Sequence, residues 1–270
     1  MLHNLSFVED PTRVFRAIRF EQRFGFTIGK LTGGLIDNAV RMNFFKRLSG
    51  KRVFTELKLL LAEENPPAAF RRLDDFKLLQ AIHPSICYNN ELAKIFASIR
   101  EVLVWYTLLF MGDIHKKWVV YFLALFRYLN NPESVREICN RLELTPQDQR
   151  IFQKERIQAD RCLKYLERHI PVKNSLLAGQ LSPFKIELVL YLMAVTSKKK
   201  IKQHISHYLT HLRHIQINLT GKDLKRMKIP PGPIYRQIFE AVLGAKLDGE
   251  ITSPQEEIEL ARQLGKQGSL

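Results

Sequence analysis

The sequence has few of the features that mark disulfide-rich, secreted or metal-binding proteins. It holds three cysteines, Cys87, Cys139 and Cys162, which lie far apart and show no metal-ligand spacing. An odd number of distant cysteines is typical of reduced thiols in a cytosolic protein rather than of a disulfide framework. The N-terminus carries no signal-peptide pattern. We therefore expect a cytoplasmic protein with no metal site in this chain.

The sequence also lacks a long apolar run and a convincing strand pattern. Its most apolar region, residues 102–129, is interrupted by Asp113, His115 and two lysines, so neither half reaches the roughly 20 residues of a membrane span. We expect two core helices there and no membrane partner. Apolar residues recur with helical spacing from end to end. The sequence thus predicts an all-α fold, an elongated multi-helical array with no sizeable sheet.

Negative charge is in short supply. The chain has 42 Lys and Arg against 27 Asp and Glu, a formal net charge of +15, and its pI is about 9.8. Because 46% of the residues are hydrophobic, the chain should fold rather than form a disordered basic tail. This charge indicates a polyanionic partner, with nucleic acid favoured over an anionic membrane.

The first helix has clear end signals and an asymmetric surface. Asp10 is its expected N-cap, Pro11 its first residue and Gly25 its C-terminal glycine. At 100° per residue, its arginines fall within an arc of about 120° beside an apolar side. These arginines are Arg13, Arg16, Arg19 and Arg23. Further helices are expected over residues 31–45, 50–63 and 69–82.

This N-terminal segment resembles a known motif. It reads Glu9-Asp10-Pro11-Thr12-Arg13, followed by Arg16-Ala17-Ile18-Arg19-Phe20. The pattern resembles the nucleotide-selecting neck motif of tRNA nucleotidyltransferases and bacterial poly(A) polymerases. Segments 50–57 and 78–84 also resemble the neck and early body of that family. Segments 219–224, 229–234 and 247–251 resemble its tail, with Pro231-Gly232-Pro233 as a helix start and Gly249 as a turn.

The resemblance implies three parts and a missing one. Residues 1–85 would form the neck and the start of the body, which is the RNA-binding domain of the poly(A) polymerase family, 86–215 the helical body, and 216–270 an RNA-binding tail. In the family, a catalytic head with a Gly-Ser and an Asp-x-Asp pair precedes the neck and holds magnesium and the triphosphate. This sequence has no Asp-x-Asp, and its only Gly-Ser is Gly268-Ser269. We therefore expect a substrate-handling portion that is catalytically silent alone, with Mg²⁺ and ATP, and CTP where C is added, belonging to the full-length enzyme.

The resemblance also assigns roles within the neck. Adenine and cytosine present an amine donor beside a ring-nitrogen acceptor, so a carboxylate and a guanidinium together accept them and reject guanine and uracil. Asp10 and Arg13 would read the base, with Glu9 as a supporting carboxylate. Arg16, Arg19 and Arg52 would hold the triphosphate or brace that pair. By the residues alone, Asp10 could equally be only a helix cap and Arg13 a solvated surface residue.

A second basic region precedes a row of histidines. The lysines of residues 198–202 open an expected helix that continues through His204, His207, His211 and His214, which would share one face. Lys198, Lys199, Lys200, Lys202 and Arg213 form a candidate RNA-binding patch. The histidines could face RNA or another helix, remain solvated, or bind zinc, although no carboxylate or cysteine joins them.

Several functions remain open at this point. A neck of this kind accepts both A and C, so the motif does not separate CCA addition, A addition and poly(A) synthesis. The tail segments favour an enzyme acting on the 3′ end of tRNA. The alternatives from other classes are a standalone all-α RNA-binding or adaptor protein that has lost the head, and a helical scaffold for protein partners.

Overall fold

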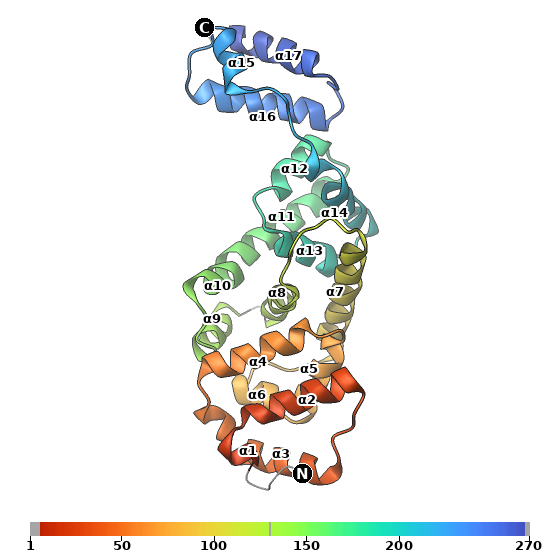
Figure 1. Ribbon diagram of the computed structural model, residues 1–270, viewed down its shortest axis with the longest axis vertical. Helices are drawn as coiled ribbons and strands as arrows, with labels where there is room; N and C mark the ends of the chain where they lie inside the picture. Colours follow the sequence, from red (N-terminus) through yellow and green to blue (C-terminus); the bar gives the residue numbers. More distant parts are fainter. Residues whose placement is uncertain (1–5, 130, 268–270) are drawn as a thin grey trace. The chain divides into compact units, whose positions relative to one another are not determined.

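A computed structural model describes residues 6–129 and 131–267 (Figure 1). The described part consists of helices and their connections, with no strand, which confirms the predicted all-α class. The chain forms two compact units. The first comprises Met1–Arg161 and Ile186–Val195, and the second comprises Cys162–Lys185 and Thr196–Leu270. The three-part division at residues 85 and 215 stays a prediction, and Gly268-Ser269 lies outside the described residues.

The first unit contains most of the helices. Its elements are α1 (Ser6–Glu9), α2 (Thr12–Phe24), α3 (Lys30–Arg41), the 3₁₀ turn η1 (Phe44–Arg47), α4 (Gly50–Ala62), α5 (Pro66–Asp75), α6 (Leu78–Ile82), α7 (Asn90–Leu108), α8 (Lys117–Leu129), α9 (Pro132–Arg141), α10 (Pro146–Arg150), the π-helix η2 (Ile151–Glu155), the first part of α11 (Arg156–His169) and α13 (Ile186–Val195). The second unit contains the rest of α11, then α12 (Asn174–Leu181), α14 (Lys199–Thr210), the 3₁₀ turn η3 (Leu212–His214), α15 (Gly221–Arg226), α16 (Pro233–Leu247) and α17 (Pro254–Gln267).

Two predicted helices are shorter or broken. The helix expected over 31–45 ends at Arg41, because Asn43 takes a left-handed conformation with φ 55° and a 3₁₀ turn follows. The helix expected over 69–82 is two helices, α5 and α6, separated at Lys77 with φ 56°. Neither break carries the glycine that usually marks a left-handed residue. Both predictions were therefore wrong, at Lys77 without a local signal and at Asn43 with only the weak preference of asparagine for this conformation.

The core of the first unit is built on α7, α8 and α13, which pack against one another. Residues 119–126 of α8 and 188–194 of α13 are buried on all sides. Phe96 and Tyr121 lie edge to face with ring centroids 4.9 Å apart, a favoured aromatic geometry. The two core helices predicted within 102–129 are confirmed as α7 and α8. No single helix in the described ranges is long and apolar enough to cross a membrane, although α12 and α13 together match the length and composition.

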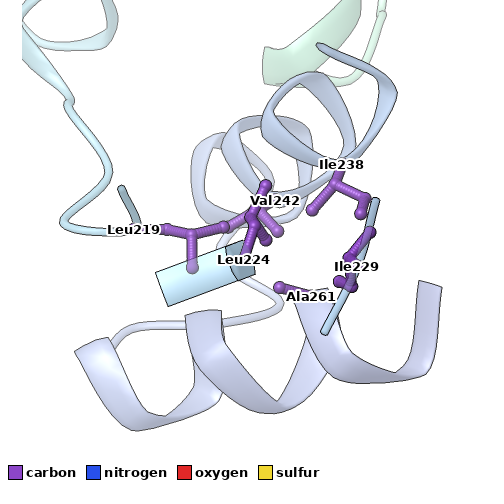
Figure 2. Packing of buried hydrophobic residues seen from close by; sticks show 6 residues of the cluster. All are labelled: Leu219, Leu224, Ile229, Ile238, Val242 and Ala261. Carbon is purple, nitrogen blue, oxygen red and sulfur yellow. The ribbon is translucent and has the colours of Figure 1, made fainter. Parts of the chain in front are cut away.

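In the second unit, α15, α16 and α17 enclose a small apolar core (Figure 2). Its buried members are Leu219, Leu224, Ile229, Ile238, Val242 and Ala261. Pro233 begins α16 and Gly249, with φ 75°, follows its end, which confirms both predicted boundaries. A side chain at Gly265 would bring Cβ within 2.4 Å of Ile229 Cδ1. The close approach of α17 to Ile229 therefore depends on this glycine.

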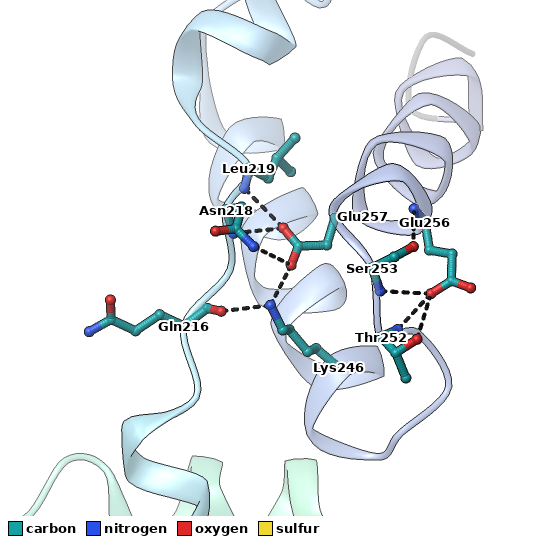
Figure 3. A network of polar contacts seen from close by, with 8 residues as sticks. All are labelled: Gln216, Asn218, Leu219, Lys246, Thr252, Ser253, Glu256 and Glu257. Atoms are coloured by element: carbon teal, nitrogen blue, oxygen red, sulfur yellow. Dashed lines mark hydrogen bonds and ion pairs between the residues drawn. The ribbon is translucent and has the colours of Figure 1, made fainter.

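A buried carboxylate, that of Glu257, joins these three helices to the segment that precedes α15 (Figure 3). Glu257 accepts hydrogen bonds from Lys246 Nζ at 2.6 Å and from the backbone N–H groups of Asn218 at 2.7 Å and Leu219 at 3.0 Å. Its side chain is 1% exposed. Burial acts to raise the pKa of Glu257, but the bonds from Lys246 and the two amides outweigh it and lower that pKa.

Candidate nucleotide-binding site

The start of α2 is organised by Asp10. One oxygen of its carboxylate, Oδ1, accepts hydrogen bonds from the backbone N–H of Thr12 at 3.1 Å and from the Thr12 hydroxyl at 2.6 Å. Asp10 therefore supplies an acceptor to the first turn, although the N-cap position is Pro11, one residue after the predicted cap, and the helix begins at Thr12. Gly25, with φ 65°, ends it as predicted. The bonds from Thr12 fix the carboxylate at the helix N-terminus, where negative charge is favoured.

The same oxygen also binds α4. Arg52 Nη2 lies 2.8 Å from Asp10 Oδ1, and both side chains stay partly exposed, at 55% and 27% respectively. Partial burial raises the pKa of Asp10, but the bonds from Thr12 and the charges of Arg52 and Arg13 lower it overall. Asp10 is therefore a carboxylate at neutral pH, ready to accept further hydrogen bonds.

A cavity of about 430 Å³ lies against these two helix starts. It is lined by Asp10, Thr12, Arg16, Ser49, Lys51, Arg52, Thr55 and Glu56. The lining combines two carboxylates with three cations and three hydroxyl-bearing side chains. This mixture suits a ligand that has both a hydrogen-bonding edge and a negative charge.

Glu56 was not among the residues predicted from the sequence. Burial raises its pKa, and the nearby charges of Arg19 and Arg16 only partly oppose that rise. Its buried atom Oε2 has no hydrogen-bond partner among the described residues, and neither does the buried Nε of Arg19. Glu56 follows Arg52 by four positions on α4, and that spacing could have identified it.

The remaining predicted neck residues lie in different surroundings. Arg16 is exposed and lines the cavity. Arg19 is half-buried, with its guanidinium 5.4 Å from the ring centroid of Phe20. Arg13 and Glu9 are not lining residues and lie 4.0 Å apart as an exposed ion pair. The structure thus brings Asp10, Arg16, Arg52 and Glu56 together at the cavity and places Arg13 with Glu9 beside it.

The predicted basic patch is largely accessible. Lys198, Lys199 and Lys200 are exposed, while Lys202 on α14 and Arg213 in η3 are half-buried. Lys198 Nζ donates to the backbone oxygen of Glu167 at 3.1 Å. Lys199 and Lys200 start α14, and their accessible charge is suited to phosphate contacts.

The predicted row of four histidines on one helix is wrong. Helix α14 ends at Thr210, and the chain turns so that Leu212, in η3, becomes buried. The rings of His207 and His211 still lie 5.1 Å apart. Burial, with the charges of His211 and His204, lowers the pKa of His207. No group of three or more histidine, cysteine or carboxylate side chains within the described ranges could hold a metal ion.

Comparison with known proteins finds relatives of this chain. Residues 25–89 match the family model described as "Probable RNA and SrmB-binding site of polymerase A". Over 268 residues the chain is 40% identical to the A-adding tRNA nucleotidyltransferase of Geobacter sulfurreducens, covering 98% of this chain and 30% of that relative. The chain is a homologue of the tRNA nucleotidyltransferases. It corresponds to the helical RNA-binding region of the CCA-adding and A-adding enzymes.

Solved structures of tRNA nucleotidyltransferases share the fold. The Thermotoga maritima CCA-adding enzyme complexed with tRNA-CCA has a TM-score of 0.77 at 26% identity, covering 97% of this chain and 62% of that chain. A CCA-adding enzyme in complex with ATP has a TM-score of 0.75 at 28% identity, covering 95% of this chain and 60% of that chain. The present chain therefore spans less than two thirds of the length of each of these tRNA nucleotidyltransferases and of the Geobacter relative.

Proposed function

We propose that this chain is the nucleotide-selecting and RNA-binding part of a cytoplasmic enzyme that adds A, or C and A, to the 3′ end of tRNA. One observation carries the nucleotide-selecting role. At the cavity between the starts of α2 and α4, the Asp10 carboxylate is paired with Arg52 at 2.8 Å, and the buried Oε2 of Glu56, another lining residue, lacks a hydrogen-bond partner among the described residues. Buried polar atoms are rarely left unsatisfied without a reason. A bound nucleotide would supply the missing partner.

The chemistry of the cavity fits the Watson–Crick edge of adenine or cytosine. A carboxylate accepts from the exocyclic amine of either base, and a guanidinium donates to the ring nitrogen beside it. Asp10 and Arg13 are the proposed base-reading pair, with Glu9 in support and Arg52 fixing the Asp10 carboxylate. Arg16 and Lys51 lie at the same cavity and are suited to the phosphates of ATP or CTP.

Catalysis is proposed to depend on parts of the enzyme other than these residues. The sequence has no Asp-x-Asp pair, and nucleotidyl transfer needs metal ions that bridge the phosphates. We expect the 270-residue chain, incubated with labelled ATP, Mg²⁺ and tRNA, to transfer no nucleotide. Measurable transfer would overturn this part of the proposal.

The RNA-binding role rests on the net charge of +15, on the exposed lysines at the start of α14 and on the likeness to an enzyme solved with tRNA. The test is the affinity of the chain for tRNA lacking its CCA end, measured across a salt series against a single-stranded RNA of equal length. We expect a preference for tRNA, with log affinity falling by about 0.7–0.9 per phosphate contact for each tenfold rise in salt. No preference, or no binding, would contradict a tRNA-reading role.

A second candidate function is poly(A) synthesis. It is favoured by the family model over residues 25–89, whose description names polymerase A. The same competition experiment separates the two, because a poly(A) enzyme is expected to bind the single-stranded RNA at least as well as the tRNA.

A further inference from the structure

The first turn of α4 has no cap of its own. Ser49 occupies the N-cap position but makes no side-chain bond to the helix, and the first turn contains no acidic residue. Instead, the backbone N–H of Gly50 donates to Glu143 Oε1 at 2.8 Å. Helix N-termini need acceptors for their free amides and favour a nearby negative charge. The cap of α4 thus comes from a residue 93 positions further along the chain.

Arg141, two residues before this glutamate, holds the segment that leads into α4. Its guanidinium donates to the backbone oxygens of Phe45 at 2.9 Å and Leu48 at 3.2 Å. The two backbones also touch, since a Cβ on Gly50 would lie 2.0 Å from the carbonyl oxygen of Arg141. Only glycine allows this approach. The start of α4 is therefore held by two side chains and by direct backbone packing.

The conformation of Glu143 indicates that its side chain is what matters at this position. The backbone N–H of Leu144 donates to the carbonyl of Cys139, and Glu143 has φ 51° at the end of α9. Glycine usually fills this left-handed place after a helix, because a side chain is strained there. A strained residue that persists points to a function for its side chain. In this structure the side chain of Glu143 accepts the bond that caps α4.

The held helix start carries half of the candidate nucleotide site. Ser49, Lys51, Arg52, Thr55 and Glu56 all line the cavity. Arg52 reaches Asp10 from the first turn of α4, so a small shift of this turn would move its guanidinium away from the carboxylate. Catalytic and binding groups tolerate displacements of only about 0.5 Å before function suffers.

We propose that the turn containing Arg141 and Glu143 is a positioning element for nucleotide selection, acting through the first turn of α4 on the Arg52–Asp10 pair. The inference rests on the proposed nucleotide-selecting function. Glu143 and Arg141 are positioning residues, because neither lines the cavity.

The test uses Glu143→Gly in the 270-residue chain. Glycine removes the cap on α4 but relieves the strain of the left-handed backbone, so the two effects should largely offset each other and the melting temperature should change little. Amide exchange over residues 50–55 should become about fivefold faster, as expected for a lost helix cap. NMR titration with ATP, CTP, GTP and UTP should show weaker ATP and CTP binding by a similar factor, with the preference over GTP and UTP reduced. Arg141→Gln should act in the same direction.

Two control variants isolate the effect. Lys77→Gly makes the same backbone change at another left-handed residue, with φ 56°, and Glu133→Gln removes an exposed carboxylate from α9. Both should leave nucleotide preference and amide exchange over 50–55 unchanged.

The outcomes distinguish the inference from the proposed function. If Arg52→Ala abolishes nucleotide preference while Glu143→Gly and Arg141→Gln leave it intact, the positioning inference is overturned. If Arg52→Ala and Asp10→Asn also leave the wild-type preference intact, or the wild-type chain shows none, the nucleotide-selecting function fails and the inference with it. Loss of preference in Glu143→Gly with an unchanged melting temperature supports both.

Discussion

Two glutamates, one in each unit, are surrounded in opposite ways. Glu257 is 1% exposed, and its carboxylate accepts bonds from Lys246, from two backbone amides and from the side-chain amide of Asn218. Glu56 is half-buried, and one of its oxygens has no partner among the described residues. The pKa of Glu257 is lowered and that of Glu56 is raised. The difference indicates that the carboxylate near the C-terminus completes a structure, while the one near α2 is left open for a ligand.

The largest effect is expected from removing the satisfied carboxylate. Glu257→Ala removes the acceptor of two backbone amides and the anionic partner of Lys246, which keeps only its bond to the Gln216 carbonyl. It should destabilise the second unit by about 3–5 kcal/mol, as for other broken buried pairs. Chemical unfolding, with hydrogen exchange over residues 219–264, measures it. The control Glu259→Ala removes an exposed carboxylate that pairs with Arg262 and should cost about 0.5 kcal/mol or less. Equal losses in the two variants would contradict the structural role of Glu257.

At the candidate nucleotide site, Arg13→Ala should reduce the preference for adenine over guanine nucleotides. A bidentate base contact discriminates by about 1–3 kcal/mol, so the preference for ATP over GTP should fall by roughly ten- to a hundredfold. Binding of tRNA should change little, because contacts to phosphates hold the RNA in place whereas contacts to bases determine specificity. Nucleotide titration and tRNA binding assays measure the two effects. The control is Arg23→Ala on the same helix, where Arg23 pairs with Glu63. Equal losses of tRNA affinity and of nucleotide preference in Arg13→Ala would refute the assignment.

The contributions of Glu257 and Glu56 to stability should change in opposite directions as the pH falls. The folded pKa of Glu257 lies below its ordinary value of 4.5, so its contribution is present above that value and is lost as the pH falls through the folded pKa. Unfolding measured from pH 6 to pH 3 should show the wild type losing stability relative to Glu257→Gln. A constant difference between the two proteins over this range would contradict the lowered pKa.

The smallest effect is expected at Glu56. Its folded pKa is raised, so its contribution to stability is present below the unfolded pKa and is lost as the pH rises through the folded pKa. Glu56→Gln should therefore leave stability at pH 7 unchanged or raise it by less than about 1 kcal/mol, because the group is only partly buried. Thermal unfolding checks this. Clear destabilisation at pH 7 would show that Glu56 serves the fold and not a ligand.

Features with a local cause were predictable from the sequence. Gly25 and Gly249 as left-handed residues and Pro233 as a helix start are all confirmed, and Asp10 accepts from the first helical amide although the N-cap position is Pro11. Each of these features depends only on the neighbouring backbone, so a few adjacent residues are enough to predict it. The all-α class followed from helical spacing in the same way.

Features with a distant or hidden cause were not predictable. Lys77 breaks a predicted helix in a left-handed conformation that its residue type does not indicate, whereas Asn43 belongs to a type enriched in that conformation and is only a weak signal for it. The turn at His211 follows from burial of the next leucine, which is a tertiary effect. The neck motif identified Asp10 and Arg52, yet their direct pairing and the unpartnered oxygen of Glu56 depend on how α2 and α4 meet.

The cap that Glu143 supplies to α4 limits how the proposed nucleotide-selecting region could be used as a module. The family model ends at residue 89, whereas the carboxylate that caps α4 belongs to Glu143. A protein engineer who transplanted only residues 1–89 into another enzyme would deliver Arg52 on a helix with a frayed start. The smallest segment that could be transferred with its structure intact extends at least through the turn after α9. An inserted or deleted residue in that turn should displace the first turn of α4 and so change the candidate nucleotide cavity.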